Sequence, residues 1–479
     1  MVRLFIIFFA VVLTLGGCNT SPNNSETKQV GCIDCHHFQL DDNHNFACTV
    51  CHQGSDSAAD KQEAHQDLIA LPAHPDNMAA SCGTCHESAI NNILKSAHYT
   101  LKNSVNRFRR SFGAKEELVS LLKVPDVTDP SNILELADDL LRSRCLRCHL
   151  FTAGDDYPAT HRGTGCSACH LRFSANRLTE HRFTSATDEA CLACHYGNYV
   201  GADYYGWYEH DFSIEFRTPY TTTEEYLRPY GVEFHQLRPD IHKIKKLQCL
   251  DCHSGEELMG GESNGPSCGG CHSKEELASK TQQNITAEDG NYFLHAKDGT
   301  IHPVPLLRHP AHYDRDRKIS CQACHAQWTF NDLGKHFLRS DTDNYDIFAN
   351  LSVQGSSEIE KLVDNNNDFD QPELPIIMID KLTGQPRQGV WYKGFTTRRW
   401  ENVTLGRDQN GVITTVRPLL DYRLSWIDEN DVVRFNSVAP RTPGNGFFPY
   451  VPHTTGAAGL FYQERIRTFL TEESSATGD

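Results

Sequence analysis

The pattern Cys-x-x-Cys-His occurs nine times in this chain of 479 residues, and the nine copies contain eighteen of its nineteen cysteines. Numbered one to nine in chain order, the copies are Cys32/Cys35/His36, Cys48/Cys51/His52, Cys82/Cys85/His86, Cys145/Cys148/His149, Cys166/Cys169/His170, Cys191/Cys194/His195, Cys249/Cys252/His253, Cys268/Cys271/His272 and Cys321/Cys324/His325. Any fold of this chain must therefore accommodate nine similar sites, each with two thiols and one imidazole.

The spacing within each copy is the one by which c-type haem is attached to protein. Two thiols three positions apart can both add to the vinyl groups of one porphyrin, and the next residue then lies beneath the iron. There its imidazole acts as the proximal ligand. We therefore expect nine covalently attached haems, held by the eighteen cysteines and ligated by the nine histidines of the copies.

Other uses of paired cysteines explain less of the pattern. A structural zinc site needs four ligands in a tetrahedron, and it does not require histidine directly after the second cysteine. A disulfide framework suits an even number of cysteines in an exported protein, but it gives no reason for the constant spacing or the histidine. A thioredoxin-like redox motif would occur once, on a strand-to-helix turn. Zinc and disulfides remain the alternatives to haem.

The first residues have the layout of a secretory signal. One positive charge, Arg3, precedes an apolar run over 4–15 that is too short to span a membrane. The sequence Leu15-Gly16-Gly17-Cys18 resembles a bacterial lipobox. This resemblance implies a signal peptide over 1–17, cleavage before Cys18 and lipidation of that thiol; the alternative is an ordinary signal peptide cleaved slightly downstream.

The segment after Cys18 is polar and has no apolar period, so we expect a lipid-anchored flexible tether over 18–31. Export agrees with haem attachment, because c-type haem is attached outside the cytoplasm. We expect an exported lipoprotein anchored in a bacterial membrane, facing the periplasm or located in the outer membrane or at the cell surface.

The composition limits the fold and the partners. With 39% hydrophobic residues, the apolar supply is modest for a chain of this length. We expect a multihaem cytochrome c fold, with mostly short α-helices and irregular loops around a haem stack. The net charge of −17 argues against nucleic acid as a partner. It favours redox partner proteins with basic docking surfaces, or it only keeps an exported protein soluble.

The chain divides by the placement of its motifs and by its periodicity. Helical spacing of apolar residues predicts helices near 87–98, 118–122 and 133–141, whereas alternation after Asn410-Gly411 predicts hairpins of a small C-terminal antiparallel β domain. The expected organisation after the tether is haems one to three over 32–100, a haem-free helical insertion over 101–144, haems four to nine over 145–340, and a haem-free β-rich domain over 341–479.

Sixteen of the 25 histidines lie outside the nine copies and can supply the second ligand of each iron. A haem with two histidine ligands has no open coordination position, so it passes electrons and does not bind a substrate at iron. Only four methionines are present, so methionine can be the ligand of only a minority of the haems. The candidate distal ligands are His44, His65, His98, His161, His181, His210, His235, His242 and His312.

The chain resembles multihaem c-type cytochromes of bacterial respiration. The stretches from Cys48 to His65 and from Ser81 to His98 are similar to the group related to octahaem tetrathionate reductase and hydroxylamine oxidoreductase. The resemblance implies closely spaced haem pairs in one continuous chain. Nitrite reductases of this broad class carry a Cys-x-x-Cys-Lys motif, which is absent here. The segment 452–455 resembles one that precedes a further haem motif in longer relatives, so the C-terminal domain is interpreted as a cap.

These observations favour an electron carrier over an enzyme. The expected function is relay of single electrons along nine haems in anaerobic respiration, with extracellular acceptors among those considered. The alternative is a multihaem reductase or oxidase that acts on a small nitrogen or sulfur compound at one haem with an open position. A third hypothesis is self-association of copies into longer chains of haems.

Overall fold

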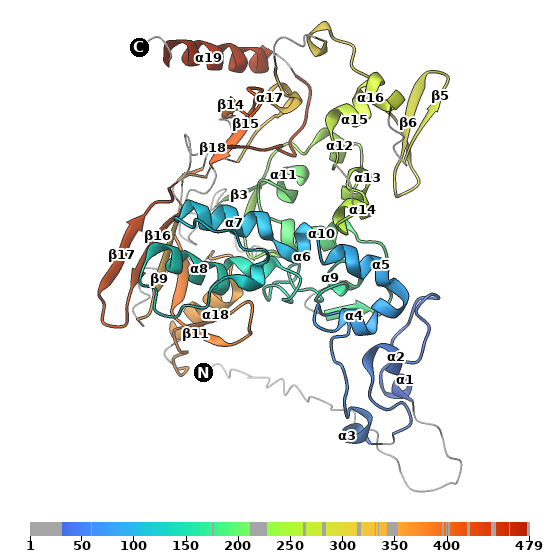
Figure 1. The fold of residues 1–479 in the computed structure, drawn as a ribbon, viewed down its shortest axis with the longest axis vertical. Helices are drawn as coiled ribbons and strands as arrows, with labels where there is room; N and C mark the ends of the chain where they lie inside the picture. The colour runs from blue at the N-terminus through green and yellow to red at the C-terminus, as the bar shows by residue number, and fades with distance from the viewer. Residues whose placement is uncertain are drawn as a thin grey trace, which may run out of the picture.

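The computed structural model describes residues 31–476 (Figure 1), apart from 59, 175–176, 211–227, 262–264, 280–283, 314–317, 331, 334, 343–352, 369, 395–396, 399, 401–402, 419–421, 442–446 and 459. The predicted signal, Cys18, nearly all of the tether and the side chain of His210 lie outside this part. None of the helices that the structure describes is both long and apolar enough to cross a membrane.

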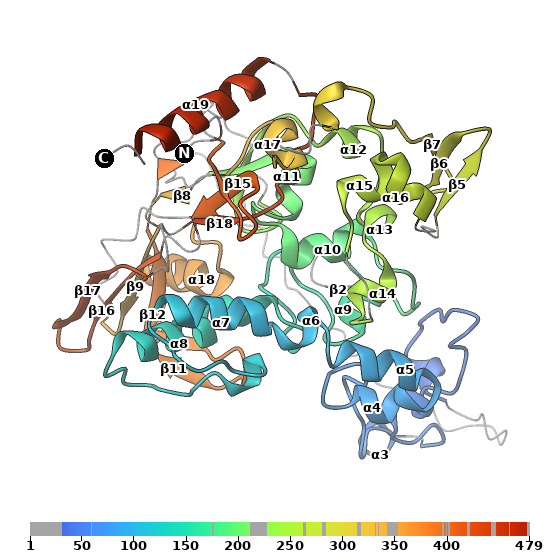
Figure 2. The ribbon, with the colours of Figure 1, turned by 45° about the horizontal axis from the view of Figure 1, so that its top comes forward.

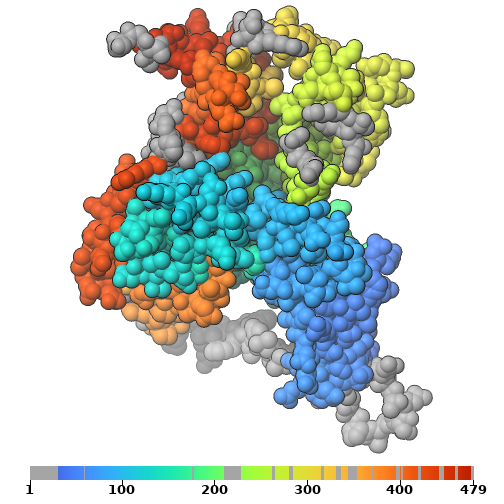
Figure 3. All heavy atoms as spheres, in the orientation of Figure 1, coloured from blue at the N-terminus to red at the C-terminus, as the bar shows by residue number. Residues whose placement is uncertain are grey.

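The first three motifs lie in an N-terminal lobe that projects from the body (Figures 1 and 3). The predicted helix over 87–98 is split there: α5 ends at Ile93, and α6 begins after Ser96, whose side chain accepts a hydrogen bond from the Tyr99 backbone as an N-cap. The lobe's helices are α1 (Cys32–Cys35), α2 (Thr49–His52), α3 (Lys61–Ala64), α4 (Met78–Ser81), α5 (Gly83–Ile93) and α6 (Ala97–Thr100).

The insertion and the C-terminal part share one apolar core. Helix α8 packs with α7 beside a four-stranded sheet of order β12-β9-β16-β17, in which β9 and β16 run parallel and the other pairs antiparallel. The fully buried side chains of Leu136, Leu140, Trp391 and Leu424 belong to this core. The elements are α7 (Lys102–Ser111), η1 (Leu121–Lys123), α8 (Ile133–Ser143), β9 (Lys335–Ser340), β12 (Val390–Lys393), β16 (Tyr422–Ile427) and β17 (Val433–Val438).

Buried charges join the same two segments. Asp139 of α8 accepts hydrogen bonds from Arg387 Nη2 at 2.7 Å and from Trp391 Nε1 at 2.8 Å. Arg142, one turn on, donates to Asp380 at 2.7 Å. Each of these side chains is almost completely buried, so the charges need their partners to remain inside the protein. The insertion is thereby fixed to the C-terminal strands.

Motifs five to nine lie on short helices connected by loops and small hairpins. Figure 2 shows α17, which carries the ninth motif, between α19 and β15 of the C-terminal part. The remaining elements are α9 (Ser167–His170), α10 (Asp188–His195), α11 (Gly201–Tyr205), α12 (Ile241–Ile244), α13 (Cys249–Cys252), α14 (Gly255–Leu258), α15 (Cys268–His272), α16 (Lys274–Ser279), α17 (Cys321–His325), α18 (Ser357–Asn366), α19 (Leu460–Ala476), β1 (Arg172–Ser174), β2 (Arg177–Glu180), β3 (Trp207–His210), β4 (Glu233–Gln236), β5 (Ile285–Glu288), β6 (Asn291–His295), β7 (Ile301–Pro303), β8 (Asp332–Leu333), β10 (Ile377–Ile379), β11 (Pro386–Gln388), β13 (Thr397–Arg398), β14 (Leu405–Arg407), β15 (Ile413–Pro418) and β18 (Phe447–Pro449), with the 3₁₀ turns η2 (Cys145–Cys148) and η4 (Pro310–His312).

Candidate metal centres

Each motif lies on or at a short helical turn, and this local structure brings its two cysteines together. In α1, α13, α15 and α17 the turn begins at the first cysteine itself. Residues three apart on a helix lie on the same face, so both thiols of a motif point the same way. All eighteen motif cysteines are free thiols, without a disulfide bond.

Seven motif histidines lie close to a histidine from elsewhere in the chain. In each pair exactly one member belongs to a Cys-x-x-Cys-His copy. Within the described residues, the pairs and the distances between ring centres are His36–His65 at 6.0 Å, His86–His44 at 6.1 Å, His52–His181 at 6.0 Å, His195–His98 at 6.2 Å, His272–His242 at 6.1 Å, His253–His453 at 6.5 Å and His325–His312 at 6.1 Å.

These distances suit two imidazoles on opposite faces of one iron. A bond from a metal to an imidazole nitrogen is about 2 Å long, which places two such rings with their centres roughly 6 Å apart. A porphyrin supplies four nitrogens of its own and leaves two axial positions, the number that one histidine pair fills. Among the described residues, no group of three or more His, Cys, Asp and Glu side chains is arranged to hold a metal ion by itself.

In most of the pairs, at least one histidine ring is oriented by a hydrogen bond from its Nδ1. Nδ1 of His52 donates to the Ile69 carbonyl at 3.0 Å, and Nδ1 of His272 donates to the Pro305 carbonyl at 2.7 Å. Histidines that bind metals commonly donate one ring N–H to a carbonyl or carboxylate, which fixes the tautomer. The other nitrogen, Nε2, is then left as the ligand. Comparable Nδ1 bonds are made by His44 to Asp41, His98 to Leu258, His170 to Thr184, His242 to Asp240, His253 to Glu257 and His325 to Gly456.

Burial keeps a central motif histidine neutral, which a ligand nitrogen requires. The pKa of His195 is lowered to about 4, first by burial and then by the neighbouring imidazoles of His98, His253 and His453. Its ring is therefore unprotonated over the physiological range. The sixth motif accordingly presents a neutral imidazole to its partner His98.

The structure brings six of the nine candidate distal histidines to a motif histidine, namely His44, His65, His98, His181, His242 and His312. His161 lies instead against Phe173, with ring centres 6.1 Å apart. His235 lies on β4, opposite Tyr208 of β3. The assignments of His161, His210 and His235 therefore stay predictions.

His453 is not among the candidate distal ligands, although the structure places it 6.5 Å from His253. It belongs to the C-terminal part, far in sequence from every motif. A signal was present: the segment 452–455 resembles one that accompanies haem motifs in longer relatives. The absence of a following motif directed the interpretation towards a cap.

His149 of motif four and His170 of motif five are in none of the seven pairs, and the hydrogen bonds of His149 differ from those of the other motif histidines. The backbone N–H of Phe151 donates to Nδ1 of His149 at 3.0 Å, while Nε2 donates to the Lys381 carbonyl at the same distance. Both ring nitrogens thus contact the backbone. His149 is only 1% exposed, and burial lowers its pKa to about 4. His74 is the nearby histidine whose charge acts on it.

Thiols from different motifs meet in space. Side-chain hydrogen bonds join motifs three and five, four and six, six and seven, and eight and nine, through Cys82–Cys166, Cys148–Cys194, Cys191–Cys249 and Cys268–Cys321. Motifs one and two, two and three, five and six, and seven and eight are close enough for one thiol to raise the pKa of another, in the pairs Cys32–Cys48, Cys51–Cys82, Cys169–Cys191 and Cys252–Cys271. The spatial order is therefore one, two, three, five, six, seven, eight and nine, with four attached beside six.

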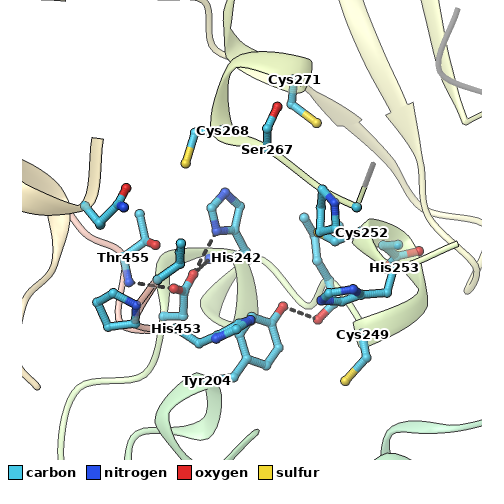
Figure 4. A pocket seen from close by; sticks show the side chains of 18 of the residues that line it. Tyr204, His242, Cys249, Cys252, His253, Ser267, Cys268, Cys271, His453 and Thr455 are labelled. Carbon is cyan, nitrogen blue, oxygen red and sulfur yellow. Dashed lines mark hydrogen bonds and ion pairs between the residues drawn. The ribbon is translucent and has the colours of Figure 1, made fainter. Parts of the chain in front are cut away.

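A continuous cavity of about 3290 Å³ follows the second half of this order. It is lined by cysteines of motifs four to nine, and Figure 4 shows part of it, with His242, His253 and His453 near the thiols of Cys249 and Cys268. Pockets for one small ligand measure roughly 300–1,000 Å³, so this cavity suits several large flat groups. In Figure 3 the surface is hollowed between the orange-red and yellow-green segments that flank it.

The motif cysteines differ in exposure. Six motif cysteines are exposed, and four of these line the cavity, namely Cys169, Cys252, Cys268 and Cys321. Cys35 and Cys85 are exposed in the N-terminal lobe and are not among its lining residues.

The position of Cys85 on α5 explains its exposure. The apolar face of this helix consists of Ile90 and Ile93, which pack with Met78 in a small core, and Cys85 lies off that face. Its thiol is near enough to Cys51 of motif two to raise the pKa of that cysteine. Attachment of haem through Cys85 stays a prediction.

The donor set as a whole fits covalently bound haem, with the cysteine pairs as attachment points and the histidine pairs as axial ligands. The cavity lining combines apolar side chains with thiols and imidazoles, which suits a porphyrin with a central metal. Comparisons with known proteins add nothing to this assignment, because no family model, no curated protein and no solved structure matches the chain.

Proposed function

We propose that this chain is a nonahaem c-type cytochrome that carries electrons. The observation that supports the proposal most is the set of seven histidine pairs, each with one motif member and a ring separation of 6.0–6.5 Å. Nothing in the repeat itself requires a second histidine at that distance. Axial ligation of iron by two imidazoles accounts both for the distance between the rings and for the presence of exactly one motif histidine in each pair.

A haem with two histidine ligands takes up and releases one electron without an open coordination position. The role of the protein is to hold the ligands and to exclude water. The Nδ1 hydrogen bonds fix the rings of His52, His272 and His325, so little reorganisation is needed when the charge at the site changes. The lowered pKa of His195, in the middle of the spatial order, keeps that imidazole neutral.

The contacts between motifs support relay from one end of the protein to the other. Every motif has a thiol that bonds to, or is linked by a pKa shift to, a thiol of another motif, and the resulting order runs from the N-terminal lobe to α17. The first motif lies in the lobe that follows the tether, and the ninth lies beside the C-terminal helix (Figure 1). We infer that electrons enter at one of these ends and leave at the other.

The proposed setting is a bacterial envelope. The polypeptide would be anchored to a membrane through lipid on Cys18, and its charge of −17 would favour donor or acceptor proteins with basic surfaces. Anaerobic respiration, with a periplasmic or extracellular acceptor, is the corresponding physiological proposal. Self-association that extends the chain of haems belongs to the same proposal.

The test is to purify the protein from a host that matures c-type cytochromes, and to measure intact mass, haem content and ferric spin state. We expect nine covalent haems and mainly low-spin signals from electron paramagnetic resonance. A control protein in which the nine motif histidines are retained but all motif cysteines are serine should be colourless. A colourless wild-type protein with the mass of the bare polypeptide would contradict the proposal.

The fourth motif favours a second candidate function, reduction or oxidation of a small nitrogen or sulfur compound. Neither His149 nor His170 of motif five is in one of the seven pairs, and both ring nitrogens of His149 contact the backbone. Arg162 lies beside His149, its Nε is buried without a hydrogen-bond partner among the described residues, and guanidinium groups suit oxyanions. A high-spin ferric signal that changes on addition of nitrite or hydroxylamine, and that disappears when Cys145 and Cys148 are replaced, would favour this function. Exclusively low-spin signals would exclude it.

A further inference from the structure

Four consecutive residues of the C-terminal part, His453 to Gly456, reach three neighbouring motif sites. We call them the C-terminal ligand segment. The segment approaches motif seven through a side chain, motif eight through a backbone N–H, and motif nine through a carbonyl. Nothing in the repeat pattern indicates that these sites depend on residues so far along the chain.

At motif seven the contact is direct. The rings of His253 and His453 are stacked, 28° apart in plane and 6.5 Å between centres. Tyr204 packs edge-on against His453, and its hydroxyl donates to the Leu247 carbonyl at 2.7 Å, which fixes the tyrosine (Figure 4). Nδ1 of His453 is buried without a hydrogen-bond partner among the described residues. A half-buried imidazole with a buried Nδ1 that faces a motif histidine at this distance is placed as a metal ligand, not as a surface residue.

At motif eight the contact passes through Asp240. The backbone N–H of Thr455 donates to Oδ2 of Asp240 at 2.5 Å, and Oδ1 of the same carboxylate accepts from Nδ1 of His242 at 2.8 Å. His242 in turn lies 6.1 Å from His272 of the motif. Asp240 is 2% exposed, so its orientation is set by these donors. The segment therefore fixes the rotation of the His242 ring indirectly, through Asp240.

At motif nine the segment holds the proximal histidine. Nδ1 of His325 donates to the Gly456 carbonyl at 2.8 Å, and the Gly456 N–H donates to the His325 carbonyl at 2.9 Å. The two bonds form a reciprocal pair between one glycine and one motif residue. A Cβ at position 456 would lie 2.3 Å from the Gln327 side chain, so this close approach favours glycine.

The segment is itself rigidly held. Thr454 is fully buried, its hydroxyl donates to the Trp328 carbonyl at 2.6 Å, and its own carbonyl accepts from the Gln327 N–H at 2.9 Å. Gln327 Nε2 also donates to the Thr455 carbonyl at 2.9 Å. These bonds tie residues 453–456 to the strand-like chain that leaves α17. The position of His453 is thus determined by the fold of the C-terminal part.

We propose that His453 is the second axial ligand of the haem iron at motif seven, and that residues 454–456 position the ligand histidines of motifs eight and nine. The inference rests on the proposed function, since it assumes haem at these motifs. It assigns the C-terminal part a role in ligation. Asp240 and Gly456 are positioning residues, because they act through His242 and His325.

The experiment compares His453→Ala with His295→Ala in the full-length protein. His295 is an exposed histidine on β6 whose Nε2 hydrogen-bonds to Thr286, so its loss controls for removal of an imidazole. We expect both variants to carry nine haems by intact mass. Only His453→Ala should convert one haem of the nine from a low-spin to a high-spin ferric signal, and added imidazole should restore the low-spin form.

The variant His453→Met provides a second test of the assignment if the alanine variant does not accumulate. Methionine can replace histidine as a ligand and raises the haem potential, so one haem should remain low-spin and titrate at a higher potential than in the wild type. Nine haems with unchanged spectra and potentials in both variants would overturn the assignment of His453 and leave the proposed function standing. A wild-type protein without covalent haem would overturn both.

Discussion

The carboxyl group of Asp203 gives a pH dependence of stability that can be calculated from the structure. Asp203 lies on α11, near the wall of the cavity, and is 0% exposed. Burial raises its pKa from 3.8 to about 7, although hydrogen bonds from Asn198 and from the Tyr199 backbone partly oppose this. The native state therefore binds this proton more tightly than the unfolded state does.

The sign and size follow from proton linkage. A group whose pKa is higher in the native state contributes stability that is complete below pH 4 and lost as the pH rises to about 7. A shift from 3.8 to about 7 corresponds to roughly 4 kcal/mol in the free energy of unfolding. The variant Asp203→Asn cannot ionise. Its stability relative to wild type should therefore rise by about 4 kcal/mol between pH 4 and pH 8.

The amide loses one acceptor, which costs about 1 kcal/mol at every pH and does not alter this difference. The assay is equilibrium unfolding in urea, followed by far-ultraviolet circular dichroism at both pH values. Asp298→Asn is the control: the Thr300 backbone lowers the pKa of that exposed carboxyl, so its effect has the opposite sign. A relative stability of Asp203→Asn that is the same at pH 4 and pH 8 would refute burial as the cause.

Three further predictions concern the buried charges, a surface pair and the attachment sites. Asp139→Ala removes the buried carboxylate that accepts from Arg387 and Trp391, leaves Arg387 only its pairs with Asp380 and Asp126, and should cost about 3–5 kcal/mol in urea unfolding, whereas Asp126→Ala, at a half-exposed carboxylate near the same arginine, should cost far less. Arg407→Ala breaks an exposed pair with Glu473 and should change the free energy of unfolding by less than about 1 kcal/mol; a larger loss would mean that the pair fixes α19. Serine at both cysteines of motif four should lower the intact mass by one haem, and an unchanged mass would show that this motif carries none.

The local parts of the structure could be predicted from the sequence. The motif turns are short and depend on neighbouring residues, and the strand predicted over 422–427 coincides with β16. The helix predicted over 133–141 coincides with most of α8. By contrast, the helix predicted over 118–122 is reduced to the 3₁₀ turn η1, and α7 was not predicted. Both stretches pack against strands from the far end of the chain, and such contacts leave no periodic signal.

The partners of the motif histidines could not be predicted, because proximity in sequence does not decide them. His181 precedes motif six by ten residues but faces His52 of motif two. His242 precedes motif seven but faces His272 of motif eight. In both cases the histidine lies closer in sequence to one motif and faces another. The surplus of histidines indicated that pairs would form, and only the tertiary structure shows which.

The pair formed by His253 and His453 joins the two positions that are farthest apart in sequence among the seven pairs. A ribosome makes a chain from its N-terminus, and export follows the same direction. During biogenesis the seventh motif must therefore wait for nearly the whole polypeptide before its partner arrives, whereas His36 meets His65 early. A polypeptide that is cut short before residue 453 therefore lacks the imidazole that faces the seventh motif.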